Sequence, residues 1–342
     1  MRQFLLNEEF ILDKVRIGVI GTGYMGKNHV RVYSEIKGVE LVAFSDIKEQ
    51  LVSQLSKHYD IKGYVNYLDL LEKEDIDAVS VAVPTPIHKK VIMDVFSYNK
   101  HVLVEKPITV NLEEANSLIK SSEQKNLIFM VGHVERFNPA ILKMKELLKN
   151  DYFGEIVSLS ARRVGPFITR ARDTGVIIDL AIHDIDIMRF LTEKSINRVH
   201  ALGRKKLTQY EDYAKVLLEF KGGILGSIEV NRLTPTKIRD LSITCTQGFA
   251  TLDYITQDIS VYGKILDTDF KDYDELILKF GNPEIGKPFV KKQEPLKLEL
   301  EHFVSCIRAH KKPLVNGREG LKNLEIALRA QKSVNDNYIK IE

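Results

Sequence analysis

Short apolar runs alternate with longer mixed segments along the first third of the chain. The apolar runs predict strands at VRIGVIG (15–21), VELVAFSD (39–46), residues 63–65, AVSVAVP (78–84), HVLVEKP (101–107) and LIFMVGH (127–133). The segments between them have the spacing of amphipathic helices. Strands that alternate with helices form βαβ units, so residues 14–133 predict an α/β, doubly wound parallel sheet of the Rossmann type.

The pattern changes after a connecting helix expected at 139–149. Strand-like segments such as EIVSLSARRV (155–164) and VHALGRK (199–205) follow one another through short glycine turns, with few helices between them. Residues 134–318 therefore predict an α+β domain with a large, mainly antiparallel open sheet. A helix in 319–342 is expected to pack back on the Rossmann domain. Residues 1–13 have no assigned role, and the charged segment 267–292 is expected to be a loop.

One helical stretch, GVIIDLAIHDIDIMRF (175–190), has apolar residues on nearly every side of the helix and also contains charged residues. Its apolar pattern is typical of a buried helix, and an unpaired buried carboxylate costs several kcal/mol. Asp179 and His183 are four residues apart and therefore lie on the same helix face. We expect Asp186 to pair with a basic group and Asp184 to be structural.

The length of 342 residues favours two domains, and the net charge of +3 gives no support for nucleic-acid or membrane-surface binding. The two cysteines, Cys245 and Cys306, are far apart and lack a metal-binding or disulfide pattern. No apolar run has the length of a membrane span, and the first residues do not resemble a signal peptide. We expect a cytoplasmic protein that binds no nucleic acid and no membrane.

A glycine motif follows the first predicted strand. In GTGYMG the residues Gly21, Gly23 and Gly26 have the G-x-G-x-x-G spacing, which suits a tight turn, a bound pyrophosphate and close packing of helix on strand. Asp46 ends the second strand, where a carboxylate accepts hydrogen bonds from the ribose of NAD and repels the 2′-phosphate of NADP. The alternative is that Asp46 caps the next helix. The residues of this motif expected to bind NAD are Gly21, Thr22, Gly23, Tyr24, Met25, Gly26 and Asp46.

Two more strand ends carry unusual residues, PTPIH (84–88) and EKP (105–107). Ligands of doubly wound sheets bind beyond the carboxyl ends of the strands, so both loops are expected to face the cofactor and substrate. Lys106 lies on a rigid turn before Pro107, where a cis bond is one available conformation. His88 is expected either to contact the cofactor or to cap the next helix. The cofactor contacts expected from these loops are Pro84, Thr85, His88, Glu105 and Lys106.

Together, GTGYMG, Asp46, VAVPTPIH, EKPIT and the helix with Asp179 and His183 resemble the glucose-fructose oxidoreductase/inositol dehydrogenase (Gfo/Idh/MocA) family. The resemblance spans about residues 15–335. It implies an NAD(P)-dependent dehydrogenase acting on CH–OH groups of sugars, cyclitols or sugar nucleotides. It also implies a homodimer or homotetramer formed through the C-terminal sheet, and a catalytic lysine, aspartate and histidine at Lys106, Asp179 and His183.

In that chemistry a histidine titrating near neutrality suits removal of the hydroxyl proton, which we assign to His183. Lys106 would hydrogen-bond the oxygen and Asp179 would orient substrate and histidine. One alternative is a zinc site at Asp179 and His183; no third ligand is apparent nearby, and we expect no metal. A purely structural pair and a non-catalytic NAD-binding regulator are the others. Regulators of this fold tend to lose the lysine or histidine, and this chain has both.

Three polar residues are candidates to bind the substrate. Arg136 and Asn138 in GHVERFNPAI (132–141), and Arg163 in SARRVGP, are candidates to bind sugar hydroxyls or a phosphate; the alternative for each is a structural ion pair. GHVERFNP with GVIIDLAIHDID resembles the sugar-nucleotide branch of the family, in particular UDP-N-acetylglucosamine 3-dehydrogenases. An inositol or free-sugar dehydrogenase is the alternative.

Overall fold

The computed structural model describes residues 14–150, 152–167, 174–263 and 285–335. Residues 1–13 and most of the charged segment 267–292 lie outside the described residues. The chain divides into two units. The first comprises the chain up to Glu105, Asn116–Val131 and Leu300–Asn316. The second comprises Lys106–Ala115, Gly132–Glu299 and the chain from Gly317 onward.

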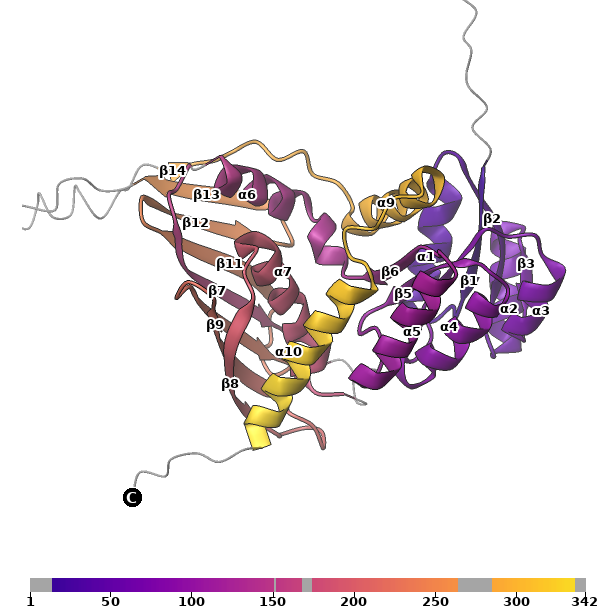
Figure 1. The fold of residues 1–342 in the computed structure, drawn as a ribbon, viewed down its shortest axis with the longest axis horizontal. Coiled ribbons are helices and arrows are strands. Elements are labelled where there is room, and N and C mark those ends of the chain that lie inside the picture. The colour runs from indigo at the N-terminus through magenta and orange to yellow at the C-terminus, as the bar shows by residue number, and fades with distance from the viewer. Residues whose placement is uncertain (1–13, 151, 168–173, 264–284, 336–342) are drawn as a thin grey trace, which may run out of the picture. The chain divides into compact units, whose positions relative to one another are not determined.

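The first unit contains a six-stranded sheet with the strand order β3-β2-β1-β4-β5-β6 (Figure 1). β1 pairs in parallel with both β2 and β4, so the strand order reverses beside β1, as in the Rossmann fold. This confirms the predicted doubly wound sheet. The strands are β1 (Val15–Ile20), β2 (Val39–Ser45), β3 (Lys62–Tyr64), β4 (Ala78–Val81), β5 (His101–Glu105) and β6 (Phe129–Gly132).

Helices connect these strands where the sequence predicts them. The central strands are buried on both faces, with Ile17, Val19, Val79 and Leu103 fully inaccessible, which explains their unbroken apolar runs. The helices that begin or end in this unit are α1 (Tyr24–Glu35), α2 (Glu49–Tyr59), α3 (Tyr67–Lys73), η1 (Thr85–Ile87), α4 (His88–Ser97), α5 (Leu112–Gln124) and α9 (Pro295–Ala309).

The second unit contains an eight-stranded sheet with the order β14-β13-β12-β11-β7-β10-β9-β8 (Figure 1). Its strand pairs are antiparallel except for β10 with β7, which confirms a mainly antiparallel sheet. Its strands are β7 (Ile156–Val164), β8 (Ile196–Arg204), β9 (Tyr213–Phe220), β10 (Leu225–Asn231), β11 (Ile238–Cys245), β12 (Gly248–Asp253), β13 (Asp258–Gly263) and β14 (Ile285–Gly286).

Helices cover one face of this sheet, with the core between them and the strands. Along β9 the side chains alternate: Ala214, Val216 and Leu218 are buried, whereas Lys215 and Leu217 are exposed. The buried set packs in one cluster with Met188 and with the helices above it. The helical elements of this unit are η2 (Val134–Phe137), α6 (Pro139–Lys149), η3 (Ile177–Ala181), α7 (Ile182–Thr192) and α10 (Gly317–Asn335).

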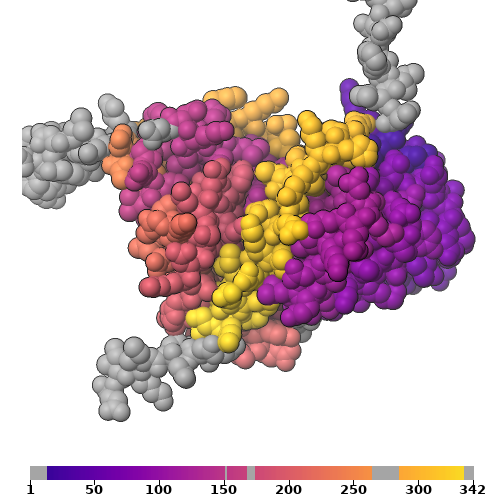
Figure 2. All heavy atoms as spheres, in the orientation of Figure 1, coloured from indigo at the N-terminus to yellow at the C-terminus, as the bar shows by residue number. Residues whose placement is uncertain are grey.

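The C-terminal helix belongs to the second unit. α10 packs against β8, η3 and α7 of the second unit, and part of its outer side is visible at the surface in Figure 2. A different segment, Leu300–Asn316, belongs to the first unit, where the Val315 carbonyl accepts a hydrogen bond from Val131 N (2.9 Å). Packing of 319–342 on the Rossmann domain stays a prediction. An amphipathic pattern indicates which face of a helix is buried, not which partner buries it. Within the described residues, no helix is long and apolar enough to cross a membrane.

Candidate functional site

The glycine motif forms the turn between β1 and α1. Gly21 has φ +84°, and a Cβ at this position would lie 2.8 Å from the Ala82 carbonyl oxygen. A Cβ on Gly26 would lie 1.8 Å from the Gly21 carbonyl oxygen, so both positions require glycine. A Cβ on Gly23 would meet nothing within 4 Å. The backbone is thus open at the start of α1, where the helix dipole and N–H groups favour a pyrophosphate, and the turn fits a dinucleotide.

Asp46 is tied to the same turn. Its Oδ2 accepts hydrogen bonds from Thr22 N (2.8 Å) and Thr22 Oγ1 (3.1 Å). Its Oδ1 accepts one from the backbone N–H of Lys48 (3.0 Å), the residue that precedes α2. The carboxylate therefore lies beside the glycine turn, as a ribose-binding acid must, and also supports the start of the next helix.

The other strand-end loops of the first unit are held by local contacts. Pro84 precedes η1, which begins at Thr85. His88 is buried, and its Nε2 lies 2.9 Å from the Val83 carbonyl oxygen, so the ring ties the loop to α4. At the end of β5, Glu105 Oε1 lies 3.0 Å from His29 Nε2. Tyr24, at the first position of α1, is largely exposed.

In the second unit, Lys106 and Asp179 form an ion pair. Lys106 Nζ donates to the carbonyl oxygen (2.8 Å) and to Oδ1 (3.0 Å) of Asp179. Asp179 Oδ2 accepts from Arg232 (3.2 Å). Burial alone would raise the pKa of Asp179, but Lys106 and Arg232 outweigh it and lower the pKa. Asp179 is therefore ionised and fixed between two cations. The Lys106–Pro107 bond is cis.

His183 begins the next turn of the same helical segment. Asp179 lies in η3, a π-helical turn that passes into α7, and such turns occur frequently at functional sites. His183 Nδ1 is buried and has no hydrogen-bond partner among the described residues. Burial, followed by the charges of Lys106 and Arg163, lowers the pKa of His183 well below its usual value. The ring is therefore neutral at neutral pH, and the expected titration near neutrality is not met, because burial and the neighbouring cations disfavour the imidazolium.

The three substrate-binding candidates have partners inside the second unit. Asn138 Oδ1 accepts from Ala140 N at the start of α6, and its Nδ2 donates to the Tyr254 carbonyl oxygen (3.0 Å). Arg163 donates to Asp184 (2.8 and 3.0 Å) and to Glu135 (2.8 Å). These contacts favour structural roles for both residues, and Asp184 is paired with Arg163.

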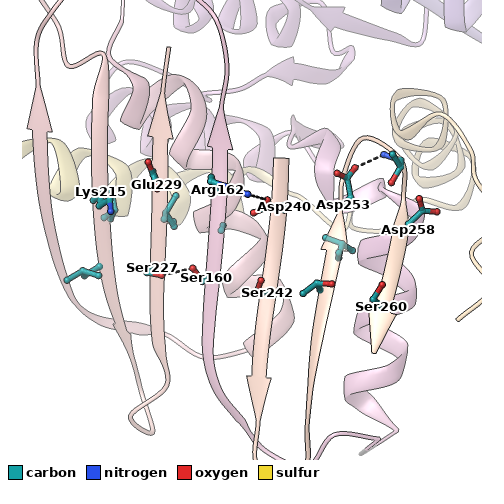
Figure 3. A pocket seen from close by; sticks show the side chains of 17 residues that line it. Ser160, Arg162, Lys215, Ser227, Glu229, Asp240, Ser242, Asp253, Asp258 and Ser260 are labelled. Carbon is teal, nitrogen blue, oxygen red and sulfur yellow. Dashed lines mark hydrogen bonds and ion pairs between the residues drawn. The ribbon is translucent and has the colours of Figure 1, made fainter. Parts of the chain in front are cut away.

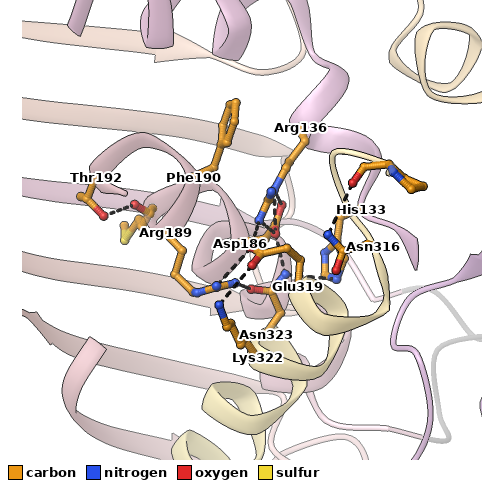
Figure 4. A network of polar contacts seen from close by, with 12 residues as sticks. His133, Arg136, Asp186, Arg189, Phe190, Thr192, Asn316, Glu319, Lys322 and Asn323 are labelled. Carbon is orange, nitrogen blue, oxygen red and sulfur yellow. Dashed lines mark hydrogen bonds and ion pairs between the residues drawn. The ribbon is translucent and has the colours of Figure 1, made fainter. Parts of the chain in front are cut away.

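Arg136 belongs to a buried ionic network, drawn in Figure 4. Its guanidinium donates to Asp186 (2.9 Å) and to Glu319 (3.0 Å), which confirms the expected basic partner of Asp186. Arg189 and Asn323 complete the network, and Asn323 Nδ2 lies 3.3 Å from His133 Nε2. These contacts favour the structural ion pair over substrate binding for Arg136.

Three residues that contact these groups were not among the candidates from the sequence: His133, Arg232 and Arg239. His133 lies in the quoted GHVERFNP stretch, and its position after β6 was a usable signal. Arg232 lies beside Asp179 and Arg239 lies beside Glu135 because of the strand order of the antiparallel sheet, which one sequence does not reveal. Among the described residues, no three His, Cys, Asp or Glu side chains gather as a metal site.

The turn that fits a dinucleotide, the Lys106–Asp179 ion pair and the neutral His183 one helical turn further on are features of a nicotinamide-dependent oxidoreductase. Residues 15–133 match the family model described as "Oxidoreductase family, NAD-binding Rossmann fold", and residues 141–251 match the GFO/IDH/MocA C-terminal domain. The chain belongs to the Gfo/Idh/MocA family, and its cofactor is NAD.

The relatives of this chain include enzymes with two kinds of substrate. A UDP-N-acetylglucosamine 3-dehydrogenase of Acidithiobacillus ferrooxidans is 28% identical, covering 94% of this chain and 97% of its own. A scyllo-inositol 2-dehydrogenase (NAD(+)) of Bacillus subtilis is also 28% identical, covering 94% of each chain. A solved structure of a UDP-N-acetylglucosamine 3-dehydrogenase from Acidithiobacillus ferrooxidans has a TM-score of 0.82 at 27% identity, covering 94% of this chain and 98% of that chain.

Proposed function

We propose that this enzyme oxidises a secondary hydroxyl of a sugar nucleotide to a ketone, with UDP-N-acetylglucosamine oxidised at C3 as the first candidate. The observation that carries the oxidation is the ion pair of Lys106 with Asp179, which lies one helical turn before the half-buried, neutral His183. The substrate is supported by the similarity to the UDP-N-acetylglucosamine 3-dehydrogenase, which extends over nearly the whole of both chains.

His183 accepts the hydroxyl proton while the hydride leaves the same carbon, so the C–H and O–H bonds break and a C=O bond forms. Bound NAD supplies the acceptor for that hydride. Lys106 donates a hydrogen bond to the substrate oxygen as negative charge develops on it. Asp179, fixed by Lys106 and Arg232, orients the lysine and the substrate. Because the pKa of His183 is low, the imidazolium then releases its proton to water at neutral pH.

The test is NADH formation by the purified protein with UDP-N-acetylglucosamine, myo-inositol and glucose. We expect turnover with the nucleotide sugar and a fall in kcat of about 10²- to 10⁴-fold in His183→Ala, the usual contribution of a general base. His200→Ala, which removes an exposed histidine on β8, is the matched control and should keep full activity.

Other results would redirect the proposal. Turnover with only myo-inositol or glucose would support the oxidation of a secondary hydroxyl and would contradict the proposed substrate. This result would agree with the inositol dehydrogenase among the relatives. Near-normal turnover in His183→Ala would remove the base assignment. Tight NADH binding without turnover on a broad panel of sugars and polyols would favour a regulator, although the chain has both Lys106 and His183.

We further propose that the enzyme assembles as a homodimer or homotetramer through the face of the eight-stranded sheet that the described helices leave open (Figure 3). This face has a hollow of about 690 Å³ lined by serines and by residues of both charges. Exposed Leu202, Leu217 and Leu225 lie on the same face. A face that carries apolar residues together with opposite charges can pair with a second copy of itself.

A further inference from the structure

The register of β7 and β11 brings two arginines together. Arg239 lies directly opposite Arg163 in the antiparallel pair, so both side chains project from the helix-covered face of the sheet. Their neighbours Arg162 and Asp240 project from the other face and pair at 2.7 Å, as Figure 3 shows. Like charges directly opposite each other destabilise a sheet unless they are compensated.

Only one of the two arginines is fully compensated. Arg163 holds both oxygens of Asp184 and also donates to Glu135 Oε1. Arg239 has that same Glu135 oxygen as its ion-pair partner, at 3.8 Å, and its side chain makes no hydrogen bond among the described residues. The Arg239 side chain is 32% exposed. Burial and the charge of Arg163 lower its pKa, yet a guanidinium stays protonated at any working pH.

The remaining carboxylates of the cluster are already occupied. Asp179 is held by Lys106 and Arg232, and His183 is neutral. The charges of Asp179 and Asp184 act on Arg239 from a distance, and that of Arg239 acts on His183, so these groups surround one region. Four cations face three carboxylates in it: Lys106, Arg163, Arg232 and Arg239 against Glu135, Asp179 and Asp184. Among these described residues the positive charges therefore exceed the negative ones by one.

We propose that Arg239 binds a phosphoryl group of the substrate and so selects phosphorylated sugars over neutral sugars and polyols. This inference rests on the proposed function, in which the substrate binds beside His183. A guanidinium donates two parallel hydrogen bonds to phosphate oxygens, which a neutral polyol accepts more weakly. A hydrogen bond to a charged group changes affinity by about ten- to hundredfold.

The experiment is calorimetry on the protein saturated with NADH, in which no oxidation of the sugar can proceed. UDP-N-acetylglucosamine, N-acetylglucosamine 1-phosphate and N-acetylglucosamine are titrated into wild type, Arg239→Gln, Arg239→Lys and Arg162→Gln. We expect Arg239→Gln to weaken the binding of one or both phosphorylated ligands by about ten- to hundredfold. The affinity for the neutral sugar should stay unchanged. The ligand that loses affinity identifies which phosphoryl source the arginine binds.

The two controls separate binding from folding. Arg162→Gln removes an equivalent charge from the opposite face of β7 and should bind like wild type. Arg239→Lys keeps the charge and should lose less affinity than Arg239→Gln. The proposal is overturned if Arg239→Gln binds both phosphorylated sugars as wild type does, if Arg162→Gln weakens them equally, or if wild type binds the neutral sugar as tightly.

These outcomes are distinct from a failure of the proposed function. Arg239-dependent binding of a phosphorylated sugar without NADH formation in the activity assay would leave the arginine's role intact and remove the oxidation. Turnover of UDP-N-acetylglucosamine with an unchanged KM in Arg239→Gln would keep the oxidation and overturn the arginine's role.

Discussion

Asp46 is the residue that we expect to decide between NAD and NADP. Its carboxylate lies against the glycine turn through Thr22, where a 2′-phosphate would meet a negative charge. We predict that Asp46→Ala lowers the ratio of kcat/KM for NAD to kcat/KM for NADP by about tenfold or more, as expected for the loss of one charged hydrogen bond. Steady-state kinetics with both cofactors measures this ratio.

A second variant separates charge from structure. Asp46→Asn keeps an oxygen that can accept from Thr22 N and removes the negative charge, so it should gain activity with NADP without loosening the turn. Glu49→Ala, at the first position of α2, is the surface control. A ratio that stays at the wild-type value in both Asp46 variants would assign Asp46 to the helix start alone.

The acids of the buried helix show what a single sequence reveals at the scale of residues. The apolar pattern around Asp179, Asp184 and Asp186 indicates that each needs a partner. In the structure Asp179 pairs with Lys106 and Arg232. Asp184 pairs with Arg163, and Asp186 pairs with Arg136. Most of these partners lie on other strands and loops, tens of residues away, and their pairing follows from strand order and register. The need for a cation is thus readable from the chain, but its identity is not.

At the scale of elements, the buried network around Asp186 joins η2, α7 and α10, and His133 is its acid-sensitive member. Burial lowers the pKa of His133 to about 4. The unfolded chain, with an ordinary histidine pKa near 6.5, therefore binds more protons between pH 6.5 and pH 4. Stability must fall as the pH is lowered through this window, by up to about 3 kcal/mol from this residue.

We predict that His133→Gln has a flatter pH dependence of the unfolding free energy than wild type between pH 6.5 and pH 4. The glutamine oxygen can still accept from Asn323 but does not titrate in this window. Urea unfolding at a series of pH values measures the difference. His200→Gln, an exposed replacement on β8, should run parallel to wild type. If wild type and His133→Gln lose stability equally, His133 is not held neutral in the fold.

The elements themselves were largely predictable because their signals are local. β-branched runs between helices predicted the parallel sheet, and strand-like segments joined by short glycine turns, such as EIVSLSARRV (155–164), predicted the antiparallel sheet. Two features depend on tertiary packing and could not be read this way. One is the return of Leu300–Asn316 to the first unit, and the other is the π-helical turn at Ile177–Ala181.

At the scale of the whole molecule, the proposed assembly depends on the sheet face that the described helices leave open. Leu217 is 55% exposed there and lies opposite Ser227, with its side chain directed away from the core. We predict that Leu217→Glu converts an assembled wild type into monomers, because a carboxylate would be buried without a partner where the leucine packed. The fold should persist, since the replaced side chain lies outside the core. Light scattering after size-exclusion chromatography measures the mass of each species. Leu142→Glu, at an exposed leucine of α6, is the control and should keep the wild-type mass. If the wild type is a monomer, or if Leu217→Glu assembles as the wild type does, this face is not the interface.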